Sequence, residues 1–167
     1  MDTRFSDGFL MAKRKKRTNP HVPEKKRLRV IADQLWSRAV RDDWSNKCAV
    51  CGHWRCEAHH LIPRGHEATR YDLRNGIALC ARCHQFDGDV APHQNAAGWL
   101  KWLEEHCPTH HQWYTETFES GQHRAFGGTK TADYYCDVIR GLREYVDIGD
   151  FERIVGVRFT RWLEDNA

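Results

Sequence analysis

Two short cysteine pairs limit what this chain can fold into. Cys48 and Cys51 form one C-x-x-C pair, and Cys80 and Cys83 form a second. Each pair can present two thiolates to one ion, and four thiolates close a tetrahedral structural zinc site with no open position. Twenty-eight residues separate Cys51 from Cys80, more than the roughly 15–20 of a simple zinc ribbon. The spacing therefore predicts an insertion between the two halves of a zinc site.

The other cysteines, and the absence of long apolar runs, narrow the class of protein further. No apolar run approaches the ~18 residues that span a bilayer, and no apolar stretch near Met1 ends at a small-residue cleavage site. Paired cysteines in an unsecreted chain favour metal over disulfides. Cys56, Cys107 and Cys136 lack partners at ligand spacing and are expected to be plain thiols, with Cys56 left as an alternative ligand.

Positive charge is concentrated at the start of the chain. Residues 1–29 carry ten Lys or Arg and three acidic residues, whereas the remaining 138 residues carry 16 and 20. Residues 1–24 also lack apolar periodicity, which predicts a flexible basic arm. The run Lys13, Arg14, Lys15, Lys16 and Arg17 is expected to bind nucleic acid, the commonest polyanion partner. Met11 directly precedes this run and is an alternative start to Met1.

Apolar periodicity predicts helices on both sides of the cysteine pairs. Leu28, Ile31 and Leu35 recur at helical spacing, which predicts a helix over about 25–44. Similar patterns predict helices over 94–107, 111–119 and from Thr131 or Asp133 to 146. The segment from 150 favours a helix, with a strand start as the alternative. We therefore expect one domain over 25–146 and a helical or mixed tail over 147–167.

The insertion between the cysteine pairs holds residues suited to phosphodiester hydrolysis. It contains the pair His59-His60, then Asn75-Gly76-Ile77, and His84 directly follows the last cysteine. Hydrolysis needs an activated water and a cation at the phosphate, and a neutral imidazole is a suitable general base near pH 7. Adjacent residues of a strand point to opposite sides, so His59 and His60 are expected to perform different tasks.

This ordered set of residues resembles the HNH endonucleases, also called His-Me finger or ββα-metal nucleases. The resemblance covers Cys48 to His84 and is to the members that have two C-x-x-C zinc knuckles. More loosely, residues 28–146 are similar to phage NinG-like recombination nucleases. The resemblance implies an α+β fold in which a ββα-metal finger with a four-cysteine zinc site is flanked by helices.

The same resemblance implies roles for individual residues. His60 would be the general base, Asn75 would fix the loop and orient His60, and His59 and His84 would hold one divalent ion, either Mg²⁺, Mn²⁺, Ni²⁺ or Zn²⁺. Many members have a further His or Lys three or four residues after the position of His84. Here these positions are Asp87 and Gly88. The remaining ligand is left open, the alternatives being Asp87, Asp89, His93 and water.

The function implied is a metal-dependent DNA endonuclease that nicks or cuts both strands, encoded by a phage or prophage and acting in the cytoplasm of a bacterial host. No membrane association is expected, and the partners beyond DNA would be a second copy of the chain or a phage protein. Two alternatives stay open: a non-catalytic zinc-ribbon DNA-binding module of a recombination or packaging complex, and a nuclease specific for DNA junctions.

Overall fold

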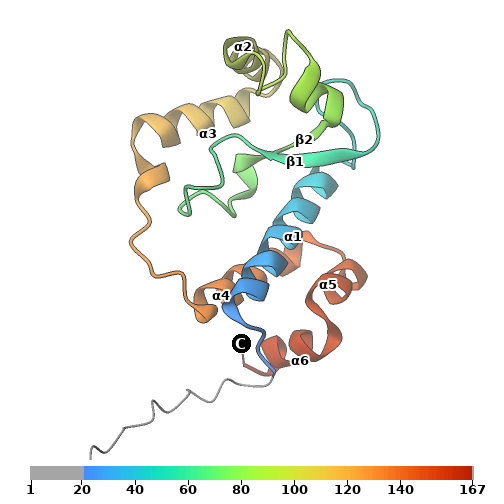
Figure 1. Ribbon diagram of the computed structural model, residues 1–167, viewed down its shortest axis with the longest axis vertical. Coiled ribbons are helices and arrows are strands. Elements are labelled where there is room, and N and C mark those ends of the chain that lie inside the picture. Colours follow the sequence, from blue (N-terminus) through green and yellow to red (C-terminus); the bar gives the residue numbers. More distant parts are fainter. Residues whose placement is uncertain (1–20, 167) are drawn as a thin grey trace, which may run out of the picture.

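A computed structural model describes residues 21–166 of the chain, so the basic run Lys13–Arg17 and most of the expected arm lie outside the described residues. The helix α1 (Lys25–Asp43) runs through the middle of the molecule (Figure 1). A two-stranded hairpin lies across its C-terminal end, and α4, α5 and α6 surround the rest of its length. No helix of the described residues is long and apolar enough to cross a membrane.

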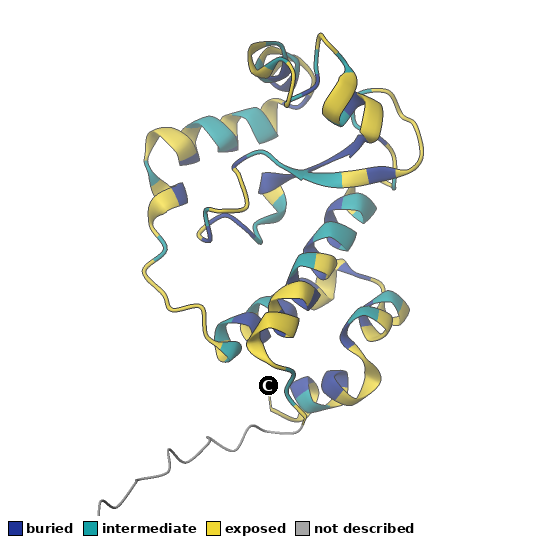
Figure 2. Cartoon of the chain, in the orientation of Figure 1, coloured by how far each residue is buried: buried dark blue, intermediate teal, exposed yellow. Residues whose placement is uncertain are grey.

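The sequence of α1 explains its place in the core. Its buried stripe includes Leu28, Ile31 and Leu35, as the periodicity predicts. This stripe packs with apolar side chains of α4 (Ala132–Leu142), α5 (Ile148–Val155) and α6 (Val157–Asp165) in the larger of two apolar clusters. Buried residues accordingly lie along α1 and along β2 (Figure 2).

The C-terminal segment is helical. Thr131 caps α4, because its side chain accepts a hydrogen bond from the backbone N–H of Tyr134. Gly156 separates α5 from α6 with a φ of 91°, a conformation that favours glycine. The strand considered for the start of this segment is absent from the described residues, since Ile154 and Val155 end a helix that buries Phe151 against α1.

The hairpin consists of β1 (Cys56–His60) and β2 (Gly76–Cys80), paired antiparallel with His60 opposite Gly76. All five residues of β2 are buried. Gly76 lies so close to α1 that a side chain there would collide with that of Val40. The loop 61–75 joins the strands and includes the short 3₁₀ helix η1 (Leu73–Asn75). Hairpin and helices together confirm the expected α+β fold.

A second, smaller apolar cluster covers the other side of the hairpin. The single-turn π-helix η2 (Arg82–Phe86) follows β2 and leads by a loop to α2 (Ala96–His106) and α3 (Pro108–Glu119). Trp99 and Leu103 of α2 pack against Ile77 and Leu79 of β2 and against the cysteines. The hairpin is therefore held between α1 on one side and α2 on the other.

Candidate metal centres

The four paired cysteines come together where the hairpin meets η2. The sulfur atoms of Cys48, Cys51, Cys80 and Cys83 all lie within 4.8 Å of one another, and those of Cys51 and Cys80 are 3.7 Å apart. Thiolates bound tetrahedrally to zinc at about 2.3 Å lie roughly 3.8 Å from each other. Burial raises the pKa of the Cys83 thiol, so a cation is needed to hold it as a thiolate. The cluster therefore fits a structural zinc ion, and the alternative ligand Cys56 is not part of it.

Backbone hydrogen bonds form the first knuckle of this cluster. The N–H of Gly52 donates to the carbonyl of Cys48 at 2.8 Å, and Gly52 has a φ of 68°. The N–H of Ala49 donates to the carbonyl of Ala78 at 2.9 Å, which ties the knuckle to β2. The two cysteine pairs therefore fix both ends of the segment that carries His59 and His60.

Three histidines form a second cluster. His59 ends β1 together with His60, His84 lies in η2, and His93 lies in the loop before α2. The Nδ1 atom of His59 is 2.9 Å from Nε2 of His84, which is 3.1 Å from Nε2 of His93. Nitrogen ligands about 2.1 Å from one ion lie roughly 3.0 Å apart in octahedral and roughly 3.4 Å apart in tetrahedral geometry, and the ligand atoms of the three rings all lie within 4.8 Å of one another. The three nitrogen atoms are thus placed to hold a single divalent ion.

The environment of these rings keeps them neutral. Burial, and then the proximity of His84 and His93, lower the pKa of His59 to about 3. Burial also lowers the pKa of His84. Neutral imidazoles are the form that binds metal ions, so the site is ready for a cation near pH 7.

His93 is the residue that completes the cluster. Among the ligands left open by the sequence, His93 belongs to it, whereas Asp87 and Asp89 do not. The carboxylate of Asp87 instead accepts hydrogen bonds from the backbone N–H groups of Asp89 and Val90. Asp87 therefore shapes the loop that brings His93 to the site.

Glu57 also lies beside this cluster, although it is not among the site residues predicted from the sequence. Its Oε2 lies 3.7 Å from Nδ1 of His84, a buried nitrogen atom with no hydrogen-bond partner. A carboxylate behind a histidine ligand fixes the ring and increases its basicity. Because Glu57 and His59 are two residues apart in β1, they share a face of the strand. This two-residue spacing is the feature of the sequence that could have indicated a role for Glu57 at the site.

His60 lies next to the three histidines but in a different environment. Its ring stacks on the indole of Trp36, with ring centres 3.7 Å apart and planes 15° apart. Its Nε2 is 3.0 Å from the carbonyl oxygen of Arg70. A carbonyl only accepts hydrogen bonds, so Nε2 carries the proton and Nδ1 has a free lone pair. Burial lowers the pKa of His60 to about 4, so the ring is neutral near pH 7.

His59, His60, His84 and His93 all border one cleft of about 590 Å³ between the hairpin and α2. Arg64, Trp99 and Tyr114 also line it. The cleft therefore combines a neutral imidazole, a candidate metal site and an exposed cation, which together suit an anionic substrate.

Asn75 is fully buried beneath the loop 61–75. Its Oδ1 accepts the backbone N–H of Ile62 at 2.6 Å, and its Nδ2 donates to the carbonyls of Ile62 and Thr69, each at 3.0 Å. The amide therefore links three backbone groups of the loop. Its hydrogen bonds do not go to His60, whose ring is bonded to Arg70 instead.

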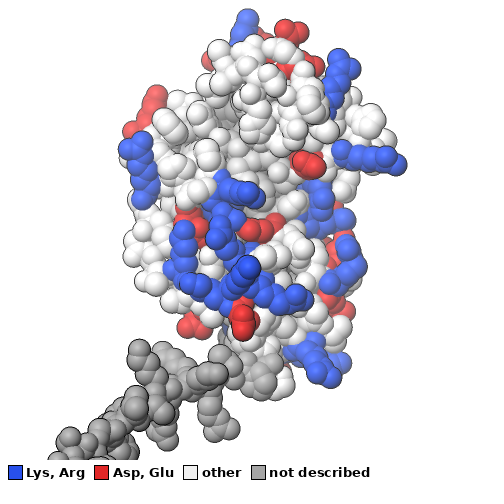
Figure 3. Space-filling view, viewed as in Figure 1, with Lys and Arg blue, Asp and Glu red and all other residues white. Residues whose placement is uncertain are grey.

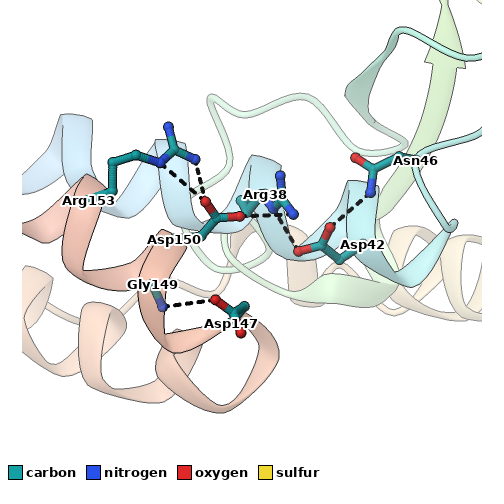
Figure 4. A network of polar contacts seen from close by, with 7 residues as sticks. All are labelled: Arg38, Asp42, Asn46, Asp147, Gly149, Asp150 and Arg153. Carbon is teal, nitrogen blue, oxygen red and sulfur yellow. Dashed lines mark hydrogen bonds and ion pairs between the residues drawn. The ribbon is translucent and has the colours of Figure 1, made fainter.

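Basic side chains gather beside the start of α1. Figure 3 shows Lys and Arg concentrated on the face over the first half of this helix, where Lys25, Lys26, Arg27 and Arg29 are exposed. A groove between α1 and α5 is lined by Arg27, Arg38, Arg41 and Arg153. Two of these arginines, Arg38 and Arg153, form ion pairs with Asp150 (Figure 4).

Comparison with protein families matches residues 46–89 to the family described as HNH endonuclease. The matched segment contains the four clustered cysteines, His59, His60, Asn75 and His84, but neither His93 nor α1. No curated protein and no solved structure matched the chain, so the looser similarity to NinG-like nucleases rests on the sequence alone. Residues 46–89 are therefore an HNH domain of the endonuclease family, with two C-x-x-C pairs that fit zinc knuckles.

Proposed function

We propose that this protein is a metal-dependent endonuclease that hydrolyses phosphodiester bonds in DNA. The observation that carries the proposal is the hydrogen bond from Nε2 of His60 to the carbonyl of Arg70. It leaves Nδ1 of a neutral imidazole free, in a cleft that also contains three histidines arranged around one potential ion. A base and a cation site in one cleft are the two components that phosphodiester hydrolysis requires.

His60 acts as the general base in this proposal. Nδ1 of His60 removes a proton from water, the hydroxide attacks phosphorus, and the bond from phosphorus to the 3′ oxygen breaks. The products are a 5′-phosphate and a 3′-hydroxyl, whose proton comes from solvent. Arg70 keeps the proton on Nε2 through its carbonyl, and Trp36 holds the plane of the ring.

His59, His84 and His93 would hold the catalytic ion. When bound, such an ion polarises the phosphate and offsets the charge on the leaving oxygen. Three imidazole ligands favour Mn²⁺, Ni²⁺ or Zn²⁺ over Mg²⁺, which prefers oxygen ligands. Because His93 is a third imidazole in the cluster, Mg²⁺ becomes the least suitable of the four ions expected from the sequence.

The zinc at the four cysteines would be structural. It would join residues 48–51 to residues 80–83 and thereby hold both ends of the segment that carries His59, His60 and Asn75. A site on so short a hairpin has little core of its own, so this link and the packing of α1 and α2 would keep the histidines in place.

The basic start of α1 and the arginine groove would bind the phosphates of DNA, together with the run Lys13–Arg17. Cutting both strands needs two active sites, so we expect a homodimer or sequential nicking. A phage or prophage origin, a phage protein partner and action in a bacterial cytoplasm belong to the same proposal.

Nicking of supercoiled plasmid in the presence of Mn²⁺ tests the proposal, with His60→Ala compared with His106→Ala. His106 is exposed at the end of α2 and borders neither metal centre. Loss of a general base lowers the rate by about 10²–10⁴-fold, so we expect this fall for His60→Ala only, with zinc content and DNA affinity unchanged.

Equal nicking by His60→Ala and wild-type protein would contradict the role of His60. If wild-type protein binds DNA and zinc but cleaves neither plasmid nor a four-way junction, the non-catalytic DNA-binding module is correct. If it cleaves the junction and spares the plasmid, the enzyme is the junction nuclease.

A further inference from the structure

The position of the carbonyl that binds His60 depends on residues outside the matched domain. Arg70 lies in the loop 61–75, between two strands, and belongs to neither. No ladder hydrogen bond fixes its backbone, yet its carbonyl oxygen determines which nitrogen atom of His60 carries the proton. The N–H of Arg70 donates to the carbonyl of Glu67 at 3.3 Å, and Asn75 binds the carbonyl of the preceding residue, Thr69. The side chain of Arg70 adds a further anchor, to α1.

The guanidinium of Arg70 is 3% exposed and makes a two-point contact with Asp33 of α1. Nε donates to Oδ1 of Asp33 at 2.9 Å, and Nη2 donates to Oδ2 at 2.7 Å. Nη1 donates to the carbonyl of Arg64 at 2.6 Å. Charge-assisted bonds of this paired geometry are stronger and more directional than neutral ones. A buried guanidinium also depends on its counter-charge.

A second contact joins α1 to the same loop. Trp36 lies three residues after Asp33, on the same side of the helix. Its Nε1 donates to the carbonyl of Asp72 at 3.0 Å, while its indole stacks on His60. Through Asp33 and Trp36, α1 therefore contacts the loop on both sides of Tyr71 and also contacts the ring of His60 itself.

We propose that Asp33 is a positioning residue for His60 and acts through Arg70. The carboxylate fixes the guanidinium, the guanidinium fixes the backbone at residue 70, and the carbonyl there keeps the proton on Nε2 of His60. The expected effect of Asp33 on catalysis rests on the proposed function. The arrangement of Asp33, Arg70 and His60 is independent of that function and can be measured without it.

The alternative is that Asp33 contributes only to stability, as an ordinary ion pair does. The ¹⁵N chemical shifts of His60 separate the two cases, because they report which ring nitrogen is protonated. Glu164→Ala is the matched control: Glu164 of α6 also makes an ion pair with a distant arginine, Arg143 at 2.6 Å, and is 44% exposed against 37% for Asp33. It borders neither metal centre nor the loop.

The experiment measures the tautomer of His60 at a fixed pH near 8 and the nicking kinetics of wild-type protein, Asp33→Ala, Asp33→Glu and Glu164→Ala. Wild-type protein should carry the proton on Nε2. In Asp33→Ala we expect a mixture of tautomers and a fall in kcat of about 10–100-fold, the range seen when a supporting residue of a site is removed. Zinc content should not change, whereas KM does not separate the two cases, because Asp33 also lines the arginine groove. Asp33→Glu should recover part of kcat, and Glu164→Ala should behave as wild type.

A single Nε2-protonated tautomer together with wild-type kcat in Asp33→Ala would overturn the proposal. A wild-type His60 protonated on Nδ1 would overturn it as well. If Asp33→Ala does not fold, Asp33→Asn, which keeps the shape and removes the charge, is judged by the same tautomer measurement. Were the wild-type protein to cleave no DNA, the proposed function would fail while the ¹⁵N shifts still decided the role of Asp33.

Discussion

His59 and His60 are neighbours in the chain, but different partners prepare them for different chemistry. The ring of His59 lies among His84 and His93, whose nitrogen atoms are 3.1 Å apart. The ring of His60 lies between Trp36 and the carbonyl of Arg70. Burial keeps both rings neutral near pH 7. One is therefore placed to bind a cation and the other to accept a proton.

Asn75→Ala should destabilise the protein. The substitution leaves the buried N–H and carbonyl of Ile62 without their partner, whereas the carbonyl of Thr69 still accepts from the N–H of Asp72 at 3.2 Å. Each buried group left unsatisfied costs about 1–3 kcal/mol, so for these two groups we expect the free energy of unfolding to fall by roughly 2–6 kcal/mol. Urea denaturation measures it, with the exposed Gln112→Ala as control. A change below about 0.5 kcal/mol would contradict the loop-fixing role.

The sequence predicted part of this site, and physical reasons explain the rest. His59, His60 and His84 sit at fixed distances from the cysteine pairs, so a local pattern could identify them. His93 depends on the path of the loop after η2, which Asp87 shapes through backbone contacts that no periodicity reveals. Asp33 lies 37 residues before Arg70, and only the folded chain shows that they meet.

At the scale of elements, the single turn η2 serves two sites. Cys83 belongs to the cysteine cluster, and the next residue, His84, belongs to the histidine cluster. Successive residues of a helical turn point about 100° apart, so one turn can face both. Loss of the zinc should therefore also disturb the position of His84.

Cys48→Ser should lose zinc and stability together. If the ~10–16 kcal/mol of structural zinc binding divides among four ligands, the loss is on the order of 3 kcal/mol or more. Cys136→Ser is the matched control, because Cys136 is buried in the core of α1 and α4 and is not part of the cluster. Metal analysis and thermal unfolding measure both effects. One tightly bound zinc per chain in Cys48→Ser would argue against the four-thiolate site.

An ion-pair network joins α1 to α5, and it should make the stability of the protein depend on pH. Arg153, and then Arg38, lower the pKa of the Asp150 carboxyl below its usual value. A lowered pKa contributes stability above the ordinary carboxyl pKa of about 3.9, and this contribution is lost as pH falls through the lowered value.

Asp150→Asn should therefore melt at a lower temperature than wild-type protein at pH 7, by a small margin because ion pairs at a protein surface contribute little. The difference should shrink below about pH 4. Melting curves between pH 2.5 and 7 test this. A difference in melting temperature that stays constant over this range would show that the charge of Asp150 is not its cause.

At the scale of the whole molecule, α1 links the parts. It forms the larger core with α4, α5 and α6, packs beneath the hairpin, and carries exposed basic residues at its start. The extent of α1 was predictable because its apolar residues recur at helical spacing over several turns. The break at Gly156 was not, since Ile154, Val155 and Val157 fit a strand as well as a helix until packing against α1 decides.

Deleting residues 1–24 should weaken DNA binding and reduce its dependence on salt. Each phosphate contact contributes about 0.9 to the slope of log K against log salt, so loss of contacts from Lys13, Arg14, Lys15, Lys16 and Arg17 would reduce the slope by roughly 4–5. Binding isotherms between 50 and 300 mM salt, approximately, measure this. The double variant Arg27→Ala/Arg41→Ala tests the groove separately. Unchanged affinity after the deletion would remove the arm from the interface.

The most direct test is nicking of supercoiled plasmid by protein stripped of its second metal ion but retaining zinc. We predict no nicking without added ion and recovery with Mn²⁺, Ni²⁺ or additional Zn²⁺. His84→Ala and His93→Ala, which each lose a direct ligand, should require more additional ion than the about 10–100-fold that loss of an outer-shell partner costs. Nicking that proceeds equally without added ion, or that no ion restores while zinc and DNA binding are intact, would contradict a metal-dependent nuclease built on these three histidines.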